Sequence, residues 1–185
     1  KSLKGVNEKQ FLKDLPHPLQ QRVTGLITKD LLVRVSAFRK LSSLVLNLLN
    51  EALEQHIFSP GDIIVPRGNC CPGLLLLARG EANILSRNDA TVSSTLGSSE
   101  TYGIEVLFQD NDATGSVVAK AYCEIYQLPK ERFREVVELY CTEYERSLMK
   151  RVVEQTIQSS AKLQKFVGGD ASAVVEGFAR HCLPN

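Results

Sequence analysis

The sequence predicts an α+β domain in which a block of short strands lies between helices at both ends of the chain. Up to about residue 55, apolar side chains recur every three or four positions, which is typical of amphipathic helices. From residue 56 short β-rich runs alternate with turn residues, and after Pro129 the helical spacing returns. These runs leave a barrel, a roll and a sandwich open, and they disfavour a parallel sheet.

Three helices are expected before the strands. The first, at residues 8–15, ends at Pro16, which cannot continue a helix. Pro18 suits the first turn of the second helix, at residues 19–30. The third, at residues 42–55, has an apolar face, and Ser42 or Ser43 is its natural N-cap.

The strand region is expected to span about residues 57–128. Its candidate strands are residues 63–65, 74–77, 82–85, 91–96, 116–121 and 122–128, separated by turns such as Arg79-Gly80. A long helix at residues 130–166 follows, with a break near Cys141-Thr142. Gly168-Gly169 ends that helix, and the remaining residues form a tail.

Composition narrows the classes of function. The 22 basic and 21 acidic residues nearly cancel, so the net charge indicates neither nucleic acid nor a membrane surface as a partner. The five cysteines form no C-x-x-C pair, and their odd number argues against a secreted disulfide framework, so a reducing compartment is expected. The three histidines lack the spacing of metal ligands, and no nucleophile–base arrangement indicates an enzyme.

The chain as given is expected to be soluble. It contains no run of roughly 20 apolar residues, the length that a spanning helix requires. Because it begins without Met inside a helix-like segment, we interpret it as a fragment of a larger protein, which could itself be a membrane protein.

Several local strings occur in an order that one family shares. The first is Leu15-Pro16 with Leu19 three residues on, and the second is Phe58-Ser59-Pro60-Gly61-Asp62. A hairpin string, Leu77-Ala78-Arg79-Gly80-Glu81-Ala82, and a helix string, Phe133-x-x-Val136-Val137-x-x-Tyr140, follow. Over about residues 5–165 this set resembles the cyclic-nucleotide-binding fold of ion channels, preceded by the end of the linker that leads from the pore.

The resemblance implies a fold and a division of the chain. The expected fold is an antiparallel, jelly-roll-like β-roll flanked by N-terminal linker helices and two C-terminal helices. Residues 1–38 would be the end of the channel C-linker and residues 39–166 the cyclic-nucleotide-binding-type domain, with the roll at about 57–128 and the C-terminal helices at 130–166. Residues 167–185 would be a tail.

The resemblance also places a ligand cassette. In members that bind nucleotide, a Phe-Gly-Glu step offers its Glu to the ribose, and a later Arg pairs with the cyclic phosphate. The matching positions here are Tyr102, Gly103, Ile104, Glu105, Val106 and Leu107, followed by Ala113, Thr114 and Gly115. Ile104 therefore stands at the position of the Glu and Ala113 at that of the Arg.

The cassette lacks the charge that a phosphate needs. No Arg occurs between Arg87 and Arg132, and Glu100, Glu105, Asp110 and Asp112 make the segment acidic. A buried anion without a cationic partner is unfavourable. Lys120 is the one base nearby, and the alternation of its strand directs it to solvent.

This departure resembles the binding-homology domains of ether-à-go-go-type potassium channels, in which a piece of the protein fills the pocket. The resemblance implies a gating-regulatory domain on the cytoplasmic side of a voltage-gated, potassium-type channel, with no cofactor and no nucleic acid. Its partners would be the pore linker and other cytosolic parts of a tetrameric parent, the fragment itself being monomeric. The tail from Lys165 onward is one candidate for the plug.

Other interpretations stay open at this stage. Glu105 is one residue from the Glu position, so a cAMP- or cGMP-sensing domain with a rearranged cassette is an alternative. A kinase or a membrane exchanger could carry the same fold, although Leu15-Pro16 and its flanking helices favour a channel. In the last helix, a stripe that includes Tyr140, Tyr144, Leu148 and Val152 predicts core packing, with Leu148 and Val152 as candidates for a lid over a ligand.

Overall fold

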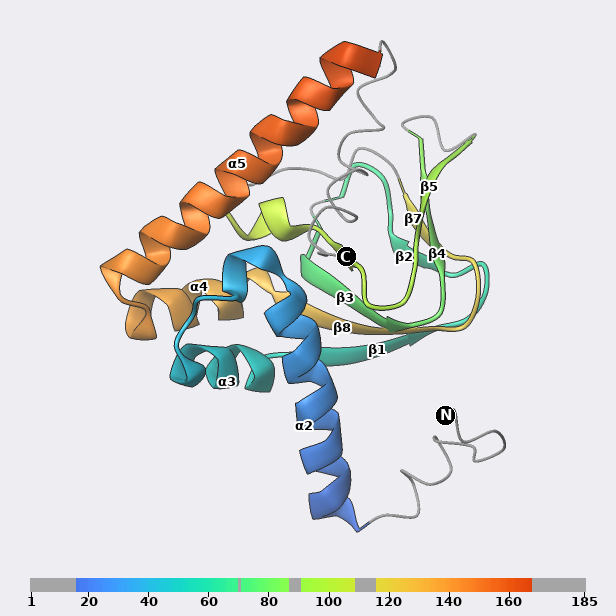
Figure 1. The fold of residues 1–185 in the computed structure, drawn as a ribbon. Coiled ribbons are helices and arrows are strands. Elements are labelled where there is room, and N and C mark those ends of the chain that lie inside the picture. The colour runs from blue at the N-terminus through green and yellow to red at the C-terminus, as the bar shows by residue number, and fades with distance from the viewer. Residues whose placement is uncertain (1–15, 70, 87–90, 109–115, 168–185) are drawn as a thin grey trace, which may run out of the picture.

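The computed structural model describes residues 16–69, 71–86, 91–108 and 116–167. The helix expected at residues 8–15 lies outside these ranges. Within them the chain forms an antiparallel β-roll with helices before and after it (Figure 1), which confirms the expected α+β architecture.

The N-terminal helices are α2 (His17–Arg34), the short 3-10 helix η1 (Ser36–Phe38) and α3 (Ser43–Glu51). α2 begins directly after Pro16 and has Pro18 in its first turn, where a missing N–H breaks no helical hydrogen bond. Ser42 caps α3, its hydroxyl accepting from the N–H of Val45 at 3.5 Å. The predicted third helix was too long, because a strand already begins at Glu54.

The roll is built from two four-stranded sheets, ordered β1-β8-β3-β6 and β2-β7-β4-β5. The strands are β1 (Glu54–Phe58), β2 (Ile63–Val65), β3 (Gly73–Arg79), β4 (Ala82–Leu85), β5 (Val92–Leu96), β6 (Thr101–Tyr102), β7 (Val117–Ala119) and β8 (Cys123–Pro129). Every pairing between them is antiparallel. β8 lies at the centre of its sheet, where Gln127 is opposite Glu54 of β1 and Leu75 of β3.

Apolar side chains from both sheets fill the interior of the roll. The buried members of this roll core are Val65, Cys71, Leu75, Leu77, Ala82, Ile84, Leu96, Tyr102, Val106, Val117, Ala119, Cys123 and Ile125. The β3–β4 hairpin closes tightly at Gly80, which has φ +100°. A Cβ there would lie 2.3 Å from the carbonyl oxygen of Tyr122, so the turn requires glycine.

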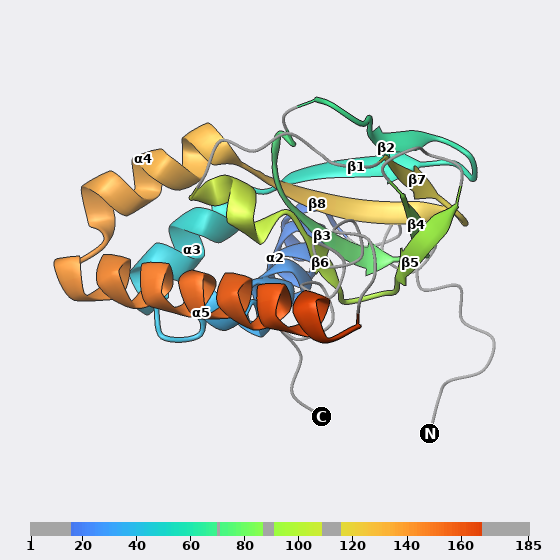
Figure 2. The same cartoon turned by 90° about the horizontal axis from the view of Figure 1, so that it is seen from above.

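The C-terminal helices are α4 (Lys130–Tyr140) and α5 (Glu143–Val167), and the break at Cys141 and Thr142 was predicted. They gather with α2 and α3 at one end of the roll and pass on either side of a second 3-10 helix, η2 (Ile104–Leu107), as Figure 2 shows. A second core, the helical core, joins these helices to the roll. Its largest members include Phe38, Leu49, Leu74, Leu128, Phe133 and Met149.

The buried face of the last helix is not the predicted one. Tyr140 and Tyr144 are 50% and 69% exposed, so their assignment to the core was wrong. Met149 and Val153 are buried instead, at 1% and 3% exposure. Because α4 and α5 are separate helices, the apolar spacing of α4 does not continue into α5. The buried face of α5 therefore lies one residue further along the sequence than predicted.

A buried carboxylate joins the two sets of helices. Glu145 and Thr142 form a capping box at the start of α5, with the Thr142 N–H and hydroxyl donating to Oε2 at 2.9 and 2.8 Å. Oε1 accepts from the N–H of Ser42, the N-cap of α3, at 2.7 Å. These donors lower the pKa of Glu145, since each favours the charged carboxylate. One side chain therefore fastens the start of α5 to the start of α3.

Candidate ligand pocket

The cassette expected from the sequence begins at a tight backbone step between β6 and η2. Gly103 has φ +85°, a left-handed conformation that side chains disfavour. A Cβ on it would lie 3.0 Å from the carbonyl oxygen of Gly73 and 3.2 Å from Sγ of Cys71. Glycine at this position lets η2 start directly against β3.

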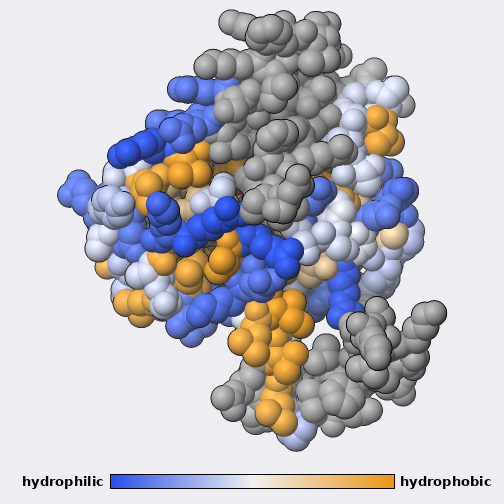
Figure 3. Space-filling view, viewed as in Figure 1, coloured by the Kyte–Doolittle hydropathy of each residue, from blue (hydrophilic) through white to orange (hydrophobic). Residues whose placement is uncertain are grey.

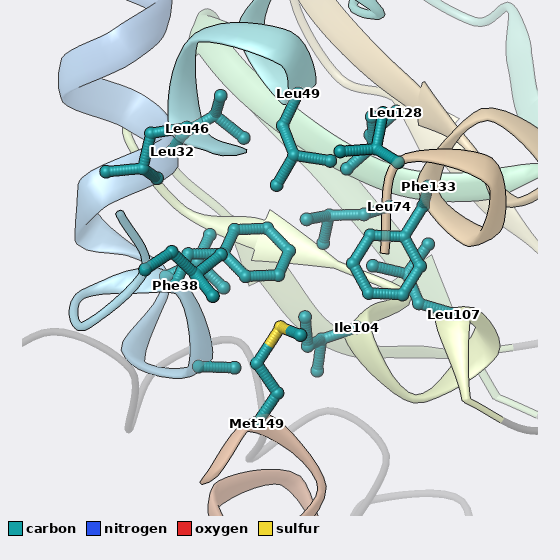
Figure 4. Packing of buried hydrophobic residues seen from close by; sticks show 14 of the residues in the cluster. Leu32, Phe38, Leu46, Leu49, Leu74, Ile104, Leu107, Leu128, Phe133 and Met149 are labelled. Atoms are coloured by element: carbon teal, nitrogen blue, oxygen red, sulfur yellow. The ribbon is translucent and has the colours of Figure 1, made fainter. Parts of the chain in front are cut away.

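The apolar side chains of the cassette point into the two cores. Tyr102 and Val106 belong to the roll core. Ile104 and Leu107, three residues apart and therefore on one face of η2, belong to the helical core. Figure 4 shows Ile104 beside Met149 of α5, among the buried side chains of the helical core. Ile104 is 6% exposed, so the position that would carry the ribose-binding Glu is occupied by a core residue.

Glu105 is the acidic residue of η2. It is half-buried, and this burial raises the pKa of its carboxyl, an effect that its own backbone N–H partly offsets. No Lys or Arg of the described chain forms an ion pair with it. Burial therefore disfavours the charged form of this carboxyl.

Ala113, Thr114 and Gly115 lie outside the described residues. The chain resumes at Ser116, which is 7% exposed and whose hydroxyl accepts from the N–H of Arg67 at 3.1 Å.

Two basic residues near the cassette differ in their role. Lys120 is exposed on the roll surface and pairs with Glu81 at 2.7 Å, which confirms that it points to solvent. The sequence did not indicate Arg67 as a site residue. Its backbone N–H donates to Ser116, and this hydrogen bond holds the turn after β2 against the end of the cassette. Nothing local signals this contact, because it joins residues 49 positions apart.

The candidate lid residues lie on α5. Leu148 and Val152 are both half-buried, and Val152 packs against the helical core. Both lie on the same side of Met149, whose side chain is buried. Whether they cover a ligand stays a prediction.

In the described ranges no group of three His, Cys, Asp or Glu residues is arranged to hold a metal ion. None of the helices at residues 16–167 that the structure describes combines the length and apolar character needed to cross a bilayer.

Comparison with known proteins gives consistent matches. Residues 55–140 match the family model described as cyclic nucleotide-binding domain. The chain is 29% identical over 138 residues to the potassium voltage-gated channel unc-103 of Caenorhabditis elegans, covering 74% of this chain and 16% of the channel. It is 25% identical over 134 residues to the human potassium/sodium hyperpolarization-activated cyclic nucleotide-gated channel 1, covering 72% of this chain and 15% of that protein.

A solved structure shows the same fold. The cAMP-bound PfPKA-R (141–441) superposes with a TM-score of 0.62 at 15% identity, over 83% of this chain and 50% of that one. At this identity the likeness concerns the fold alone. The chain spans about a sixth of the length of the curated relatives it matches.

Proposed function

The chain contains a cyclic nucleotide-binding domain related at low identity to those of ion channels, and from this premise we propose that it regulates the gating of a voltage-gated channel without binding cyclic nucleotide. In this proposal the domain is non-catalytic and lies on the cytoplasmic side of the membrane. Its partners are the other parts of the parent channel.

One observation carries the loss of nucleotide binding. The sequence has no arginine from residue 88 to residue 131, a stretch that includes the whole cassette. A cyclic phosphate taken out of water needs a charge-assisted partner, and Arg supplies two parallel hydrogen bonds to it. Lys120, the residue after β7, is paired with Glu81 on the surface.

The surroundings of Ile104 support the same proposal. A Glu at this position would place a charged group in the helical core, beside Met149 and Leu107. Burial of an unpaired carboxylate costs several kcal/mol. The position therefore contributes to packing between the roll and α5 and not to recognition of a ribose.

An exposed apolar face supports a role within a larger assembly. Figure 3 shows an orange surface on the part of α2 that projects from the body of the domain. Its exposed side chains include Leu26 at 70%, Leu19 at 44% and Ile27 at 41%. Contiguous apolar surface of this kind marks contact with other protein, and the linker helices of a channel domain would make such contact with the rest of the channel.

Titration calorimetry with cAMP and with cGMP, each to millimolar concentration, tests the proposal. We expect no heat of binding and no shift of the melting temperature. Because a ligand at 100 times its Kd stabilises the folded state by about 2.7 kcal/mol, micromolar binding would be unmistakable in the melt. Binding of that strength would refute the loss of nucleotide recognition.

A sensor with a rearranged cassette is the second candidate. It is favoured by Glu105, one residue from the expected ribose-binding position, and by Arg67, whose backbone contacts Ser116 at the end of the cassette. If calorimetry detects binding, Arg67→Ala and Glu105→Gln should each abolish it. Loss in neither variant would exclude both residues as ligands.

A further inference from the structure

The turn between η1 and α3 combines two cationic side chains with a serine. It reads Arg39-Lys40-Leu41-Ser42, and Arg39, Lys40 and Ser42 are exposed. Leu41 is 8% exposed and belongs to the helical core, so it anchors the turn while its neighbours stay at the surface. Basic residues three and two positions before a hydroxyl form the charge pattern that a basophilic serine/threonine kinase selects, because acidic groups of the kinase bind them.

The backbone of Ser42 suits this use. A kinase aligns the acceptor hydroxyl with the γ-phosphate of ATP, which an extended segment allows more easily than a helix. Ser42 is extended, with φ −61° and ψ 152°, and its hydroxyl accepts from the N–H of Val45 at a long 3.5 Å. Ser43 is already part of α3. Ser147 lies inside α5, where its hydroxyl donates to the carbonyl of Tyr144 at 2.9 Å.

Ser42 also holds the junction between α3 and α5, beside which the turn passes in Figure 2. Its N–H donates to Oε1 of the buried Glu145 at 2.7 Å. Since Cα and Cβ alone separate this nitrogen from the hydroxyl oxygen, a phosphate on that oxygen would lie within the ~8 Å over which charges interact at physiological salt. A phosphoserine carries a charge of about −1.5 to −2. It would therefore repel the Glu145 carboxylate.

The start of α3 offers the phosphate other partners. The N-terminus of a helix attracts anions, because its first N–H groups lack partners within the helix. The N–H groups of Ser42 and Val45 now donate to Glu145 and to the serine hydroxyl, and phosphate oxygens can accept from both. A phosphate would thus keep α3 capped and displace Glu145 from Ser42. Glu145 would retain the N–H of Thr142 at its other oxygen.

We propose that Ser42 is a phosphorylation site for a basophilic serine/threonine kinase and that its phosphate uncouples α3 from α5. In the transfer, Oγ of Ser42 bonds to the γ-phosphorus of ATP, the bond from that phosphorus to the β–γ bridging oxygen breaks, and ADP leaves. The hydroxyl proton passes to the catalytic aspartate of the kinase. The modification acts on the connection between the helices before and after the roll, whether or not the cassette pocket binds nucleotide.

A kinase assay on the full chain tests the site. The probe is the catalytic subunit of cAMP-dependent protein kinase with ATP, and tandem mass spectrometry locates the phosphate. We expect phosphate on Ser42 in the wild type and in the matched control Ser43→Ala. Arg39→Ala combined with Lys40→Ala should slow modification of Ser42 roughly tenfold or more, because the charges that the kinase recognises are removed.

A synthetic peptide of residues 36–46 makes a negative result decisive. If the peptide is modified and the folded chain is not, Ser42 is inaccessible in the fold and the proposal is wrong. If neither is modified, the basic residues do not make a kinase site, which overturns it equally.

Thermal melts test the uncoupling. Phosphorylation should lower the melting temperature of the wild type by roughly 3–12 °C, the effect of one charge-assisted hydrogen bond in a domain of this size. In Glu145→Gln the same modification should cause no fall, because the amide carries no charge for the phosphate to repel. Kinase-treated Ser42→Ala controls for phosphate at other positions. An equal fall in both backgrounds, or an unchanged melt of the phosphorylated wild type, would contradict the uncoupling.

Discussion

Replacement of Glu145 by Gln should remove about 2–4 kcal/mol from the free energy of unfolding, the magnitude of one or two charge-assisted hydrogen bonds. The carboxylate accepts from the N–H of Ser42 at 2.7 Å and from the N–H and hydroxyl of Thr142 at 2.9 and 2.8 Å. The amide of Gln has one accepting oxygen, so it satisfies one side of this junction and presents N–H groups to the donors of the other. A buried N–H then loses its partner.

Urea unfolding at neutral pH measures this loss. Glu143→Gln is the control, because Glu143 is exposed on the same turn and should change stability by no more than about 0.5 kcal/mol. Equal midpoints for wild type and the Glu145→Gln variant would refute the reasoning, since the junction would then contribute nothing.

The pH dependence has a definite sign. The pKa of Glu145 is lowered in the folded state from its ordinary value of 4.5. The folded state therefore binds a proton less readily than the unfolded state, and the stabilisation is fully present above pH 4.5. It is lost as the pH falls through the folded pKa, so the difference between wild type and Glu145→Gln should shrink in that acid range.

Three other changes have defined outcomes. Ala113→Arg should give cAMP binding that calorimetry detects at millimolar ligand, where the wild-type chain shows none, because a charge-assisted contact of about 1.5–3 kcal/mol strengthens binding roughly 10- to 100-fold. Gly103→Ala should cost about 1–3 kcal/mol in urea unfolding, because Ala must adopt φ +85° against a neighbouring carbonyl. Burial, together with the adjacent Glu124 carboxylate, raises the pKa of Tyr126 to about 12, so Tyr126→Phe should remove a step near pH 12 from a spectrophotometric phenol titration.

A control substitution for each change separates its expected effect from a nonspecific effect of mutation. Ala113→Gln carries no charge and should leave cAMP affinity unchanged, so a gain in that variant would contradict the electrostatic explanation. Gly97→Ala should change stability little, because its Cβ would meet Glu100 at an ordinary 3.8 Å. If Tyr122→Phe, at an exposed tyrosine, removes the same high-pH step, the assignment to Tyr126 is wrong.

The order of helices and strands could be predicted because the helical and strand spacings of apolar residues are local properties of the sequence. The change at residue 56 and the return after Pro129 predicted a block of short strands between helices, and the family resemblance implied that this block is a roll. The start of β1 was missed because the apolar residues up to Leu53 continue the helical pattern of α3. Glu54 enters a strand through its pairing with Gln127, a partner that local spacing cannot indicate.

The site was predictable only in part, for the same physical reason. The Thr142-x-x-Glu145 spacing is a local capping signature, whereas the contact of Glu145 with Ser42 joins residues 103 positions apart. The inward direction of Ile104 likewise depends on how η2 sits between two cores. Charge counting over the cassette needed no such geometry, because a missing arginine is visible in the sequence itself.

The contact between Ser42 and Glu145 closes a loop of chain that contains the entire roll. In topological terms the roll is an insertion between two adjacent points of a helical assembly. A change in the length of any roll turn leaves the connection between those two points intact. Tension applied to α2 can therefore reach α5 through one hydrogen-bonded junction, without passing along the strands.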